Sequence, residues 1–262
     1  MKAMSALRGV RHIGRGLFSA LAELGAIRMA PLHDSRTAAH RLAGALGTIA
    51  RAHDLAIEIS GDVPRSTVLL VANHVSYLDP LAILPLCPAI PVAKAEVSDW
   101  PIIGPLGSAL GAVYVRRKDP HARIRALRRI HDVLASGASV LNFAEGMTTR
   151  GERVAPLFRG SFGIAQRLGI PVVPVAIRYR DPAMAWCNGR MFLPHYLHVA
   201  GRPHVEVALQ FGAPMHPRTG ESPEAMAARA RGVIARMVQR LASPLLGAAV
   251  VANAPVLVGE RA

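Results

Sequence analysis

Acidic residues, aromatic residues and cysteines are scarce in this chain of 262 residues. It has 17 Asp and Glu against 31 Lys and Arg, a formal net charge of +14, and aromatics make up 5% of the sequence. The two cysteines, Cys87 and Cys187, are too few for a disulfide framework and fit a reducing compartment. A small secreted protein held together by disulfides is therefore excluded.

Long uncharged apolar runs are also missing, although 51% of the residues are hydrophobic and the mean hydropathy is +0.28. No stretch of about 20 residues is free of charge and helix breakers, so we expect no transmembrane helix. Glu23 interrupts the apolar run 17–27 and no clear cleavage site follows, so we expect no signal peptide. Apolar excess with positive charge favours an anionic membrane surface as partner, with peripheral or monotopic binding at the cytoplasmic face of the inner membrane.

A sequence pI of 11.3 also fits nucleic-acid binding. The scarcity of aromatics, the lack of a zinc-finger or RNP pattern and the spread of basic residues along the whole chain argue against it. His195, His198 and His204 lie close in sequence, but no cysteine or carboxylate stands at ligand spacing from them. We therefore expect neither a nucleic-acid partner nor a metal site.

Strands that alternate with helices predict an α/β fold with a largely parallel central sheet flanked by helices. We expect an N-terminal helical membrane-associating segment over 1–55, a main domain over 56–242 and a C-terminal tail over 243–262. The predicted strands are 56–59, 68–72, 90–93, 111–115, 139–143, 172–177 and 205–211. The predicted helices are 81–86, 120–136, 158–168 and one that begins at 223.

The N-terminal segment is divided by Pro31 and by the polar residues 33–35. Each half has the pattern of an amphipathic helix; in the second, Leu42, Leu46 and Ile49 keep helical spacing. Two interpretations stay open. The pair could anchor the protein in the membrane interface, or it could cover an edge of the main sheet.

Residues 68–80, V-L-L-V-A-N-H-V-S-Y-L-D-P, are the stretch around which the chain is organised. A short buried strand ends before Asn73 and His74, and Asp79 follows His74 by five positions. Five positions on a straight helix differ by about 140°, so the two side chains meet only if the backbone bends between them. A strand end followed by a helix that starts near Asp79-Pro80 supplies this bend.

A histidine bonded to a carboxylate is held in one tautomer and can act as a general base. The alternative is a pair with purely structural roles. Ser76 lies between the two, but no G-x-S-x-G turn presents it as a nucleophile, so the proton would come from the substrate's hydroxyl.

The run 100–106, W-P-I-I-G-P-L, is unusually apolar for a loop. It could line an acyl channel or dip into lipid, or it could simply be a packed loop. Lys94, just before it, could bind a phosphate, although a solvated side chain is the simpler interpretation.

Four separated motifs follow in order: N-H-x4-D at 73–79, Gly111 through Tyr114 to Arg117, F-A-E-G at 143–146, and V-P-V at 173–175. This set resembles the glycerolipid acyltransferase family, which contains the 1-acylglycerol-3-phosphate acyltransferases. The resemblance covers about residues 55–215, and the order and spacing of the four motifs make it specific. It makes the domain 56–242 an expected acyltransferase domain.

The resemblance implies transfer of a fatty acyl group from a thioester of acyl carrier protein or coenzyme A to the hydroxyl of a lysolipid. No other cofactor is expected. His74 would be the base and Asp79 would orient it, while the N–H of Gly146 would stabilise the oxyanion. The residues expected to bind substrate are Asn73, Arg117, Glu145, Thr148 and Arg150.

The third motif departs from the family pattern F-P-E-G-T-R-S. Ala144 replaces the proline, and Thr148 stands where the arginine is expected, with Arg150 two residues later. The segment 92–104 and the E-G-x-T-T ending look like the lyso-ornithine lipid acyltransferase branch, whose acceptor has no phosphate. We expect a lysophospholipid acceptor such as 1-acylglycerol-3-phosphate, with lyso-ornithine lipid as the alternative. A basic lipid-binding protein without activity is the non-enzyme alternative.

Overall fold

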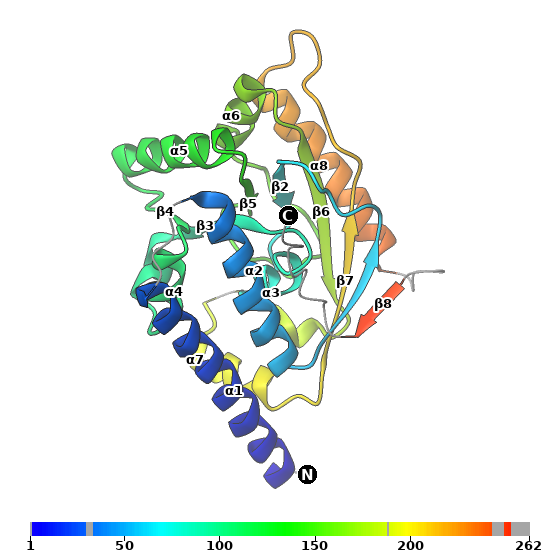
Figure 1. Cartoon of the computed structure of the whole chain (residues 1–262). Coiled ribbons are helices and arrows are strands. Elements are labelled where there is room, and N and C mark those ends of the chain that lie inside the picture. The colour runs from blue at the N-terminus through cyan, green and yellow to red at the C-terminus, as the bar shows by residue number, and fades with distance from the viewer. Residues whose placement is uncertain (1, 30–33, 188, 243–248, 253–262) are drawn as a thin grey trace.

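One sheet of eight strands lies at the centre of the molecule, and helices cover both of its faces (Figure 1). The computed structural model describes residues 2–29, 34–187, 189–242 and 249–252. In chain order the strands are β1 (Leu55–Ser60), β2 (Leu69–Ala72), β3 (Ala89–Lys94), β4 (Val113–Val115), β5 (Ser139–Asn142), β6 (Val172–Tyr179), β7 (Val205–Phe211) and β8 (Ala249–Ala252).

The strand order across the sheet is β4-β3-β5-β2-β6-β7-β1-β8. Neighbours from β4 to β6 are parallel, as are β1 and β7, whereas β6–β7 and β1–β8 are antiparallel. The prediction of a largely parallel sheet flanked by helices is therefore confirmed. The strand β2 lies inside this sheet, so its carboxyl end carries the 73–79 motif to the middle of one sheet edge.

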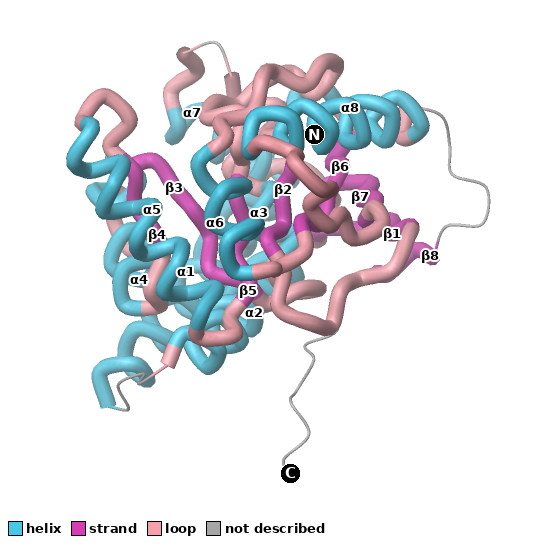
Figure 2. The backbone as a smooth tube through the Cα atoms, turned by 90° about the horizontal axis from the view of Figure 1, so that it is seen from above, coloured by secondary structure: helices cyan, strands magenta, loops and turns pink. Residues whose placement is uncertain are grey.

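Helices and short 3-10 turns connect the strands (Figure 2). The helices are α1 (Lys2–Met29), α2 (Ser35–Ala52), α3 (Asp79–Ile83), α4 (Ile103–Ala109), α5 (Pro120–Ala135), α6 (Gly160–Leu168), α7 (Phe192–Ala200) and α8 (Pro223–Arg240), and the 3-10 turns are η1 (Ala95–Asp99) and η2 (Pro182–Met184).

The strand β2 shows why the sheet needs helices on both faces. Leu70 and Ala72 pack into the hydrophobic cluster that includes residues of α2, α3, α4 and α7. Leu69 and Val71 point to the opposite face and pack with residues of α5, α6 and α8. A strand that is buried on both faces consists of a continuous run of apolar residues, and this segment has that pattern.

The N-terminal helical pair is present, and its two helices are buried to different extents. The Asp34 side chain caps α2 by accepting from the Thr37 amide at 2.8 Å, and Leu42 and Ile49 of α2 enter the core. The helix α1 packs along α2, α4 and α7 and leaves an outer face exposed. Pro31 and His33, where the segment was predicted to break, lie outside the described residues. No helix in the described ranges is long and apolar enough to cross a membrane.

Several sequence predictions of local structure were wrong. The helix α7 occupies a stretch expected to be irregular, and Ile103–Ala109 is helical although glycine and proline suggested a loop. The helix predicted at 81–86 is the shorter α3. In α5 the helical spacing also suggested a buried Ile124, but this side chain is 48% exposed and the helix packs on the core through Ala126, Ile130 and Leu134.

The C-terminal region predicted as a tail contains one described segment. Residues 249–252 form β8, which pairs antiparallel with β1 at the sheet edge. The rest of the predicted tail, 243–248 and 253–262, lies outside the described residues.

Candidate active site

The polypeptide leaves β2 through Asn73, whose side chain is held from both sides. Its amide nitrogen donates to the Ile177 carbonyl at 3.0 Å, and its amide oxygen accepts from the Ile177 N–H at 2.9 Å. Asn73 has no exposed surface. The predicted substrate-binding role of Asn73 does not fit this burial, and the side chain instead fixes the start of the bend to β6.

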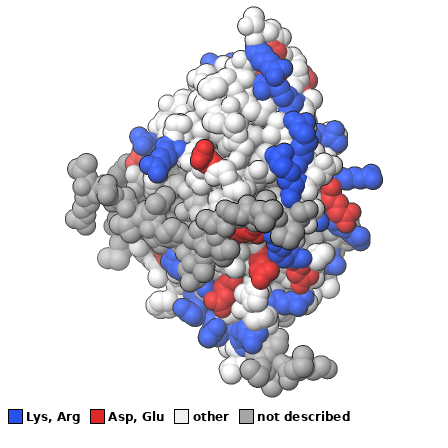
Figure 3. Space-filling model, turned by 90° about the vertical axis from the view of Figure 1, so that its right-hand side faces the viewer, with Lys and Arg blue, Asp and Glu red and all other residues white. Residues whose placement is uncertain are grey.

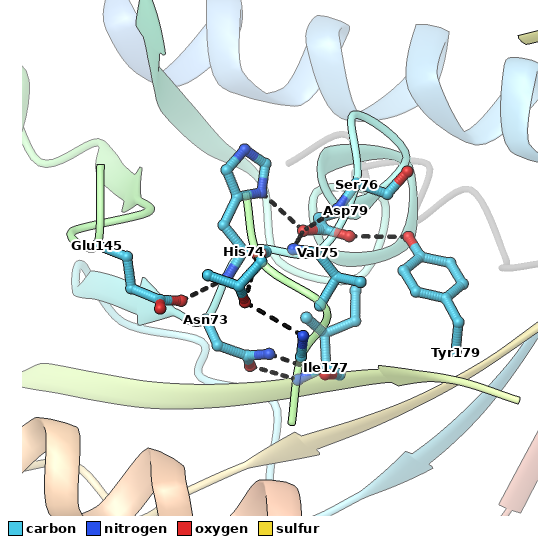
Figure 4. A network of polar contacts seen from close by, with 10 residues as sticks. Asn73, His74, Val75, Ser76, Asp79, Glu145, Ile177 and Tyr179 are labelled. Atoms are coloured by element: carbon cyan, nitrogen blue, oxygen red, sulfur yellow. Dashed lines mark hydrogen bonds and ion pairs between the residues drawn. The ribbon is translucent and has the colours of Figure 1, made fainter. Parts of the chain in front are cut away.

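The bend brings His74 and Asp79 together, as the sequence predicted. The His74 Nδ1 lies 2.7 Å from the Asp79 Oδ2 (Figure 4). Asp79 is completely buried, whereas 20% of the His74 side chain is exposed. A carboxylate on Nδ1 fixes the tautomer that leaves Nε2 free to accept a proton. Figure 4 shows this second nitrogen pointing away from Asp79.

Three further donors hold the Asp79 carboxylate. The backbone N–H groups of Val75 and Ser76 donate to Oδ2 at 2.7 and 3.1 Å, and the Tyr179 hydroxyl donates to Oδ1 at 2.8 Å. Such multiple bonding compensates a buried charge for its lost hydration. The carboxylate therefore has one orientation, with His74 in line.

Tyr179 is a site residue that sequence reasoning missed. It ends β6, beyond the V-P-V motif, and is 5% exposed. Burial and the adjacent Asp79 carboxylate raise the pKa of Tyr179 well above its ordinary value, so the phenol remains a hydrogen donor. No local sequence signal marks it, because its contact with Asp79 joins residues 100 positions apart.

Glu145 holds the backbone of the site. One carboxylate oxygen accepts from the His74 N–H at 2.9 Å and the other from the Ala155 N–H at 2.7 Å. Burial raises the pKa of Glu145, and these two amide donors oppose the rise. Because Glu145 is 4% exposed and both oxygens are occupied, it acts as a positioning residue here, which differs from the predicted contact with substrate.

Thr149 provides a second link between the two loops, which the sequence did not reveal. Its backbone N–H donates to the His74 carbonyl at 2.8 Å, and its hydroxyl lies 3.3 Å from the same oxygen. The His74 backbone is thus bonded on its N–H side by Glu145 and on its C=O side by Thr149. The imidazole itself stacks on Phe143, with ring centroids 4.0 Å apart.

The predicted oxyanion donor is already occupied. The N–H of Gly146 donates to the Phe143 carbonyl at 3.0 Å, so it does not face a reacting group in this structure. Gly146 has φ +77, and a Cβ atom there would lie 2.6 Å from the Phe158 ring and 3.4 Å from the Arg117 guanidinium carbon. Glycine is required at this position by backbone conformation and by close packing.

The remaining predicted substrate-binding residues lie around this loop. Arg117 lies close to Gly146, and this contact brings the second and third motifs together. Burial lowers the pKa of Arg117 and the nearby Glu96 carboxylate opposes this effect. Thr148 is half-buried. Arg150 is exposed and lines a separate pocket with Arg153 and Arg231.

An aromatic cluster lies beside the base on the α7 side. The backbone N–H of Trp186 donates to the Val75 carbonyl at 2.9 Å, so the cluster is joined to the His74 loop. Trp100 packs on Phe192 with centroids 4.3 Å apart, and Tyr77 contacts Trp186 and Phe192 edge-on. Of the two interpretations of the run 100–106, packing against the protein therefore applies to Trp100. Ile103 from the same run is 42% exposed.

The three histidines in and near α7 each contact different partners. The His195 ring lies between the Tyr77 hydroxyl and the Ala183 carbonyl, whereas His198 contacts Arg202 and His204 contacts Glu206. Within the described ranges, no three His, Cys, Asp or Glu side chains are grouped so that they could hold a metal ion. Burial raises the pKa of the Cys87 thiol to about 12, which fits the predicted inert core cysteine. Lys94 is exposed and pairs with Glu96.

Comparison with known proteins agrees with the fold and the four motifs. The family model described as "Acyltransferase" matches residues 55–178, so this segment of the chain is similar to that family. The match includes β1 to β5, β6 as far as Arg178, and every residue discussed above from Asn73 to Arg150. All four motifs predicted from the sequence lie within the segment that this family model matches.

Two curated relatives and one solved structure are informative. The chain is 37% identical over 124 residues to a lyso-ornithine lipid O-acyltransferase of Pseudomonas aeruginosa, covering 47% of this chain and 48% of that protein. It is 33% identical over 130 residues to a 1-acyl-sn-glycerol-3-phosphate acyltransferase of Neisseria gonorrhoeae, covering 49% and 51%. The chain thus spans about half the length of these curated relatives.

The solved structure is that of the 1-acyl-sn-glycerophosphate (LPA) acyltransferase PlsC from Thermotoga maritima. The TM-score is 0.63 with 21% sequence identity, and the match covers 90% of this chain and 99% of that one. This likeness shows the fold, and it extends beyond the segment matched by the family model.

Proposed function

We propose that this chain transfers a fatty acyl group from a thioester to the free hydroxyl of a lysolipid. The observation that carries the proposal is the His74–Asp79 pair, with Nδ1 held at 2.7 Å and Nε2 turned away from the carboxylate. A thioester is already an activated acyl group, so positioning and one general base are sufficient for the reaction.

The proposed step begins when the lysolipid hydroxyl gives its proton to the His74 Nε2. The hydroxyl oxygen attacks the thioester carbonyl carbon, forming the new C–O bond. The C–S bond then breaks, and the leaving thiolate takes the proton back from the imidazolium. Asp79 stabilises that imidazolium through Nδ1. The donor is acyl carrier protein or coenzyme A, and the product is the diacyl lipid and the free thiol.

The acceptor is proposed first as a lysophospholipid such as 1-acylglycerol-3-phosphate, the substrate named for the Neisseria relative. Arg117, which lies beside Gly146, is proposed to hold its anionic head group. Lyso-ornithine lipid is the second candidate. It is favoured by Thr148 at the position of the family arginine and by the name of the Pseudomonas relative.

The outer face of α1 is proposed to rest on an anionic membrane at the cytoplasmic face of the inner membrane. Leu7, Val10, Phe18 and Leu21 are all more than half exposed and lie on one side of the helix. Arg8, Arg11 and Arg15 flank this apolar stripe. Such a helix binds in the interfacial plane through apolar burial and attraction to anionic lipids. Vesicle sedimentation should show binding that is lost in a Phe18→Glu variant.

The activity is tested with purified protein, a labelled acyl thioester and a panel of lysophosphatidate, lysophosphatidylcholine and lyso-ornithine lipid. We expect labelled product with at least one acceptor and none from a His74→Ala variant. An exposed histidine on α5, changed as His121→Ala, is the matched control. Lipid binding that is unchanged in His74→Ala, with no product from the wild type, would favour the non-enzyme alternative. Salt-dependent retention on DNA without lipid dependence would favour nucleic-acid binding.

A further inference from the structure

A pocket of about 360 Å³ lies between the loop after β5 and the helix α8. Its lining residues are Thr149, Arg150, Glu152, Arg153, Val154, Ala155 and Arg231. Three guanidinium groups and one carboxylate therefore share this space, a formal excess of two positive charges. The proposed mechanism uses none of Arg153, Glu152 and Arg231.

The three arginines lack carboxylate partners. Throughout the described part of the chain, no Asp or Glu oxygen lies within 4 Å of the guanidinium nitrogens of Arg150, Arg153 or Arg231, although other arginines of α8 and its neighbours do form ion pairs. Arg229, for example, is paired with Glu221 at 2.6 Å. Three like charges around one pocket repel each other unless an anion lies between them.

The pocket is built on a fixed backbone. The Arg231 Nε donates to the Val154 carbonyl at 2.8 Å, which ties α8 to the loop. Ala155 is held by Glu145, and Thr149 is held by the His74 carbonyl. Gly151, at φ +76, turns the loop, and a Cβ there would lie 2.9 Å from the Val75 side chain. The same backbone segment therefore shapes the pocket and supports the base.

Basic side chains also gather on the side of the molecule where α8 lies. Figure 1 places α8 on the right-hand side of the molecule, and on the face seen from that side Lys and Arg side chains gather in a band (Figure 3). Arg231 also lies outside residues 55–178, so the pocket combines the family segment with a helix beyond it. An anion approaching from solvent on this side meets a favourable potential.

We infer that this pocket binds a phosphate group of one of the two substrates. Planar guanidinium groups bind phosphate oxygens through paired N–H donors, and several around one concave site make it selective for a polyanion. Two sources carry this chemistry: the phosphate of the phosphopantetheine arm shared by both classes of thioester donor, and the phosphate of a lysophosphatidate acceptor, which would then be bound in this pocket and not by Arg117. The inference rests on the proposed function for its physiological role, but phosphate binding itself can be measured without it.

In the binding test, calorimetry at low ionic strength measures the binding of inorganic phosphate to the purified full chain. We expect saturable binding by the wild type and a loss of about tenfold in affinity for Arg153→Gln and for Arg231→Gln, the value of one charge-assisted hydrogen bond. Arg236→Gln is the matched control, because Arg236 is exposed on the same helix but does not line the pocket. Absence of saturable binding, or an equal loss in Arg236→Gln, would overturn the inference.

The kinetic arm identifies the source of the phosphate. If the donor occupies the pocket, Arg153→Gln raises KM for the thioester with either acceptor. If the acceptor occupies it, KM rises for lysophosphatidate and stays unchanged for lyso-ornithine lipid, which has no phosphate. Unchanged KM values for all three substrates would contradict the inference even if inorganic phosphate binds.

A wild type that binds phosphate but transfers no acyl group would refute the proposed function and leave the phosphate site standing. Thermal unfolding of each variant shows whether it is folded.

Discussion

The Tyr179 hydroxyl donates to the Asp79 Oδ1 at 2.8 Å, and this bond joins the end of β6 to the start of α3. Asp79 contacts His74 through its other oxygen. Tyr179 is therefore a positioning residue, which acts on the imidazole through the carboxylate rather than by touching substrate.

Changing Tyr179 to Phe removes this donor and leaves Oδ1 of a fully buried carboxylate with one hydrogen bond fewer. We expect the free energy of unfolding to fall by about 1–3 kcal/mol, the cost of an unsatisfied buried polar group. We also expect kcat to fall while KM for both substrates stays unchanged, because the binding surfaces are not altered. Urea denaturation and steady-state kinetics check the two parts. A rise in KM with an unchanged kcat would contradict a positioning role.

Changing Glu145 to Gln replaces one acceptor oxygen with an NH2 group. Both carboxylate oxygens accept backbone N–H donors, so one of the His74 and Ala155 amides would face another donor. We expect destabilisation of about 1–3 kcal/mol and reduced kcat. Glu206→Gln is a suitable control, since that carboxylate is exposed on β7 and does not line the pocket. If Glu145→Gln kept wild-type stability and activity, the carboxylate would not be holding the loop.

Stability should fall in mild acid through His53. Its ring bridges the Ile49 carbonyl and the Tyr196 hydroxyl, and burial lowers its pKa below the ordinary 6.5. A lowered pKa means that the unfolded chain binds more protons than the folded one as the pH falls below 6.5, so stability is lost in that range. Urea midpoints measured across this range should decline more steeply for the wild type than for His53→Gln. Parallel declines would rule out His53 as the cause.

Thr149→Val tests the coupling of the two loops. The variant keeps the backbone bond to the His74 carbonyl but loses the hydroxyl, which also accepts from the Gly151 N–H at 3.1 Å. We expect a loss of about 1 kcal/mol in stability and a several-fold fall in kcat. Thr149→Ser, which retains the hydroxyl, should restore most of the activity. Failure of the serine variant to do so would mean that the methyl group, and not the bond, matters.

Sequence reasoning located the parts of the site that are local in the chain. The buried run before Asn73, the proline after Asp79 and the five-residue spacing indicated the His74–Asp79 pair, and the other three motifs decided in favour of it. The sheet followed from apolar runs bounded by turn residues, because strands buried on both faces have that pattern. The capped helix α5 followed from Asp119 and Pro120.

Contacts between distant segments could not be read in this way. Tyr179 reaches Asp79 across 100 positions, and Arg231 reaches Val154 across 77, and both depend on strand register and helix placement. The occupation of the Gly146 N–H depends on a turn whose geometry its sequence permits but does not dictate. The helix α7 was missed because its aromatic and histidine side chains carry no strong helical preference, whereas tertiary packing with Tyr77 and Trp100 stabilises it.

The most direct measurement is acyl transfer by His74→Ala, Asp79→Asn and the double variant, each compared with the wild type under saturating substrates. If Asp79 acts through His74, the double variant should be no slower than His74→Ala alone, and Asp79→Asn should lower kcat by on the order of 10²–10⁴. All three should still bind lysolipid. Acyl transfer at the wild-type rate by His74→Ala would contradict the account.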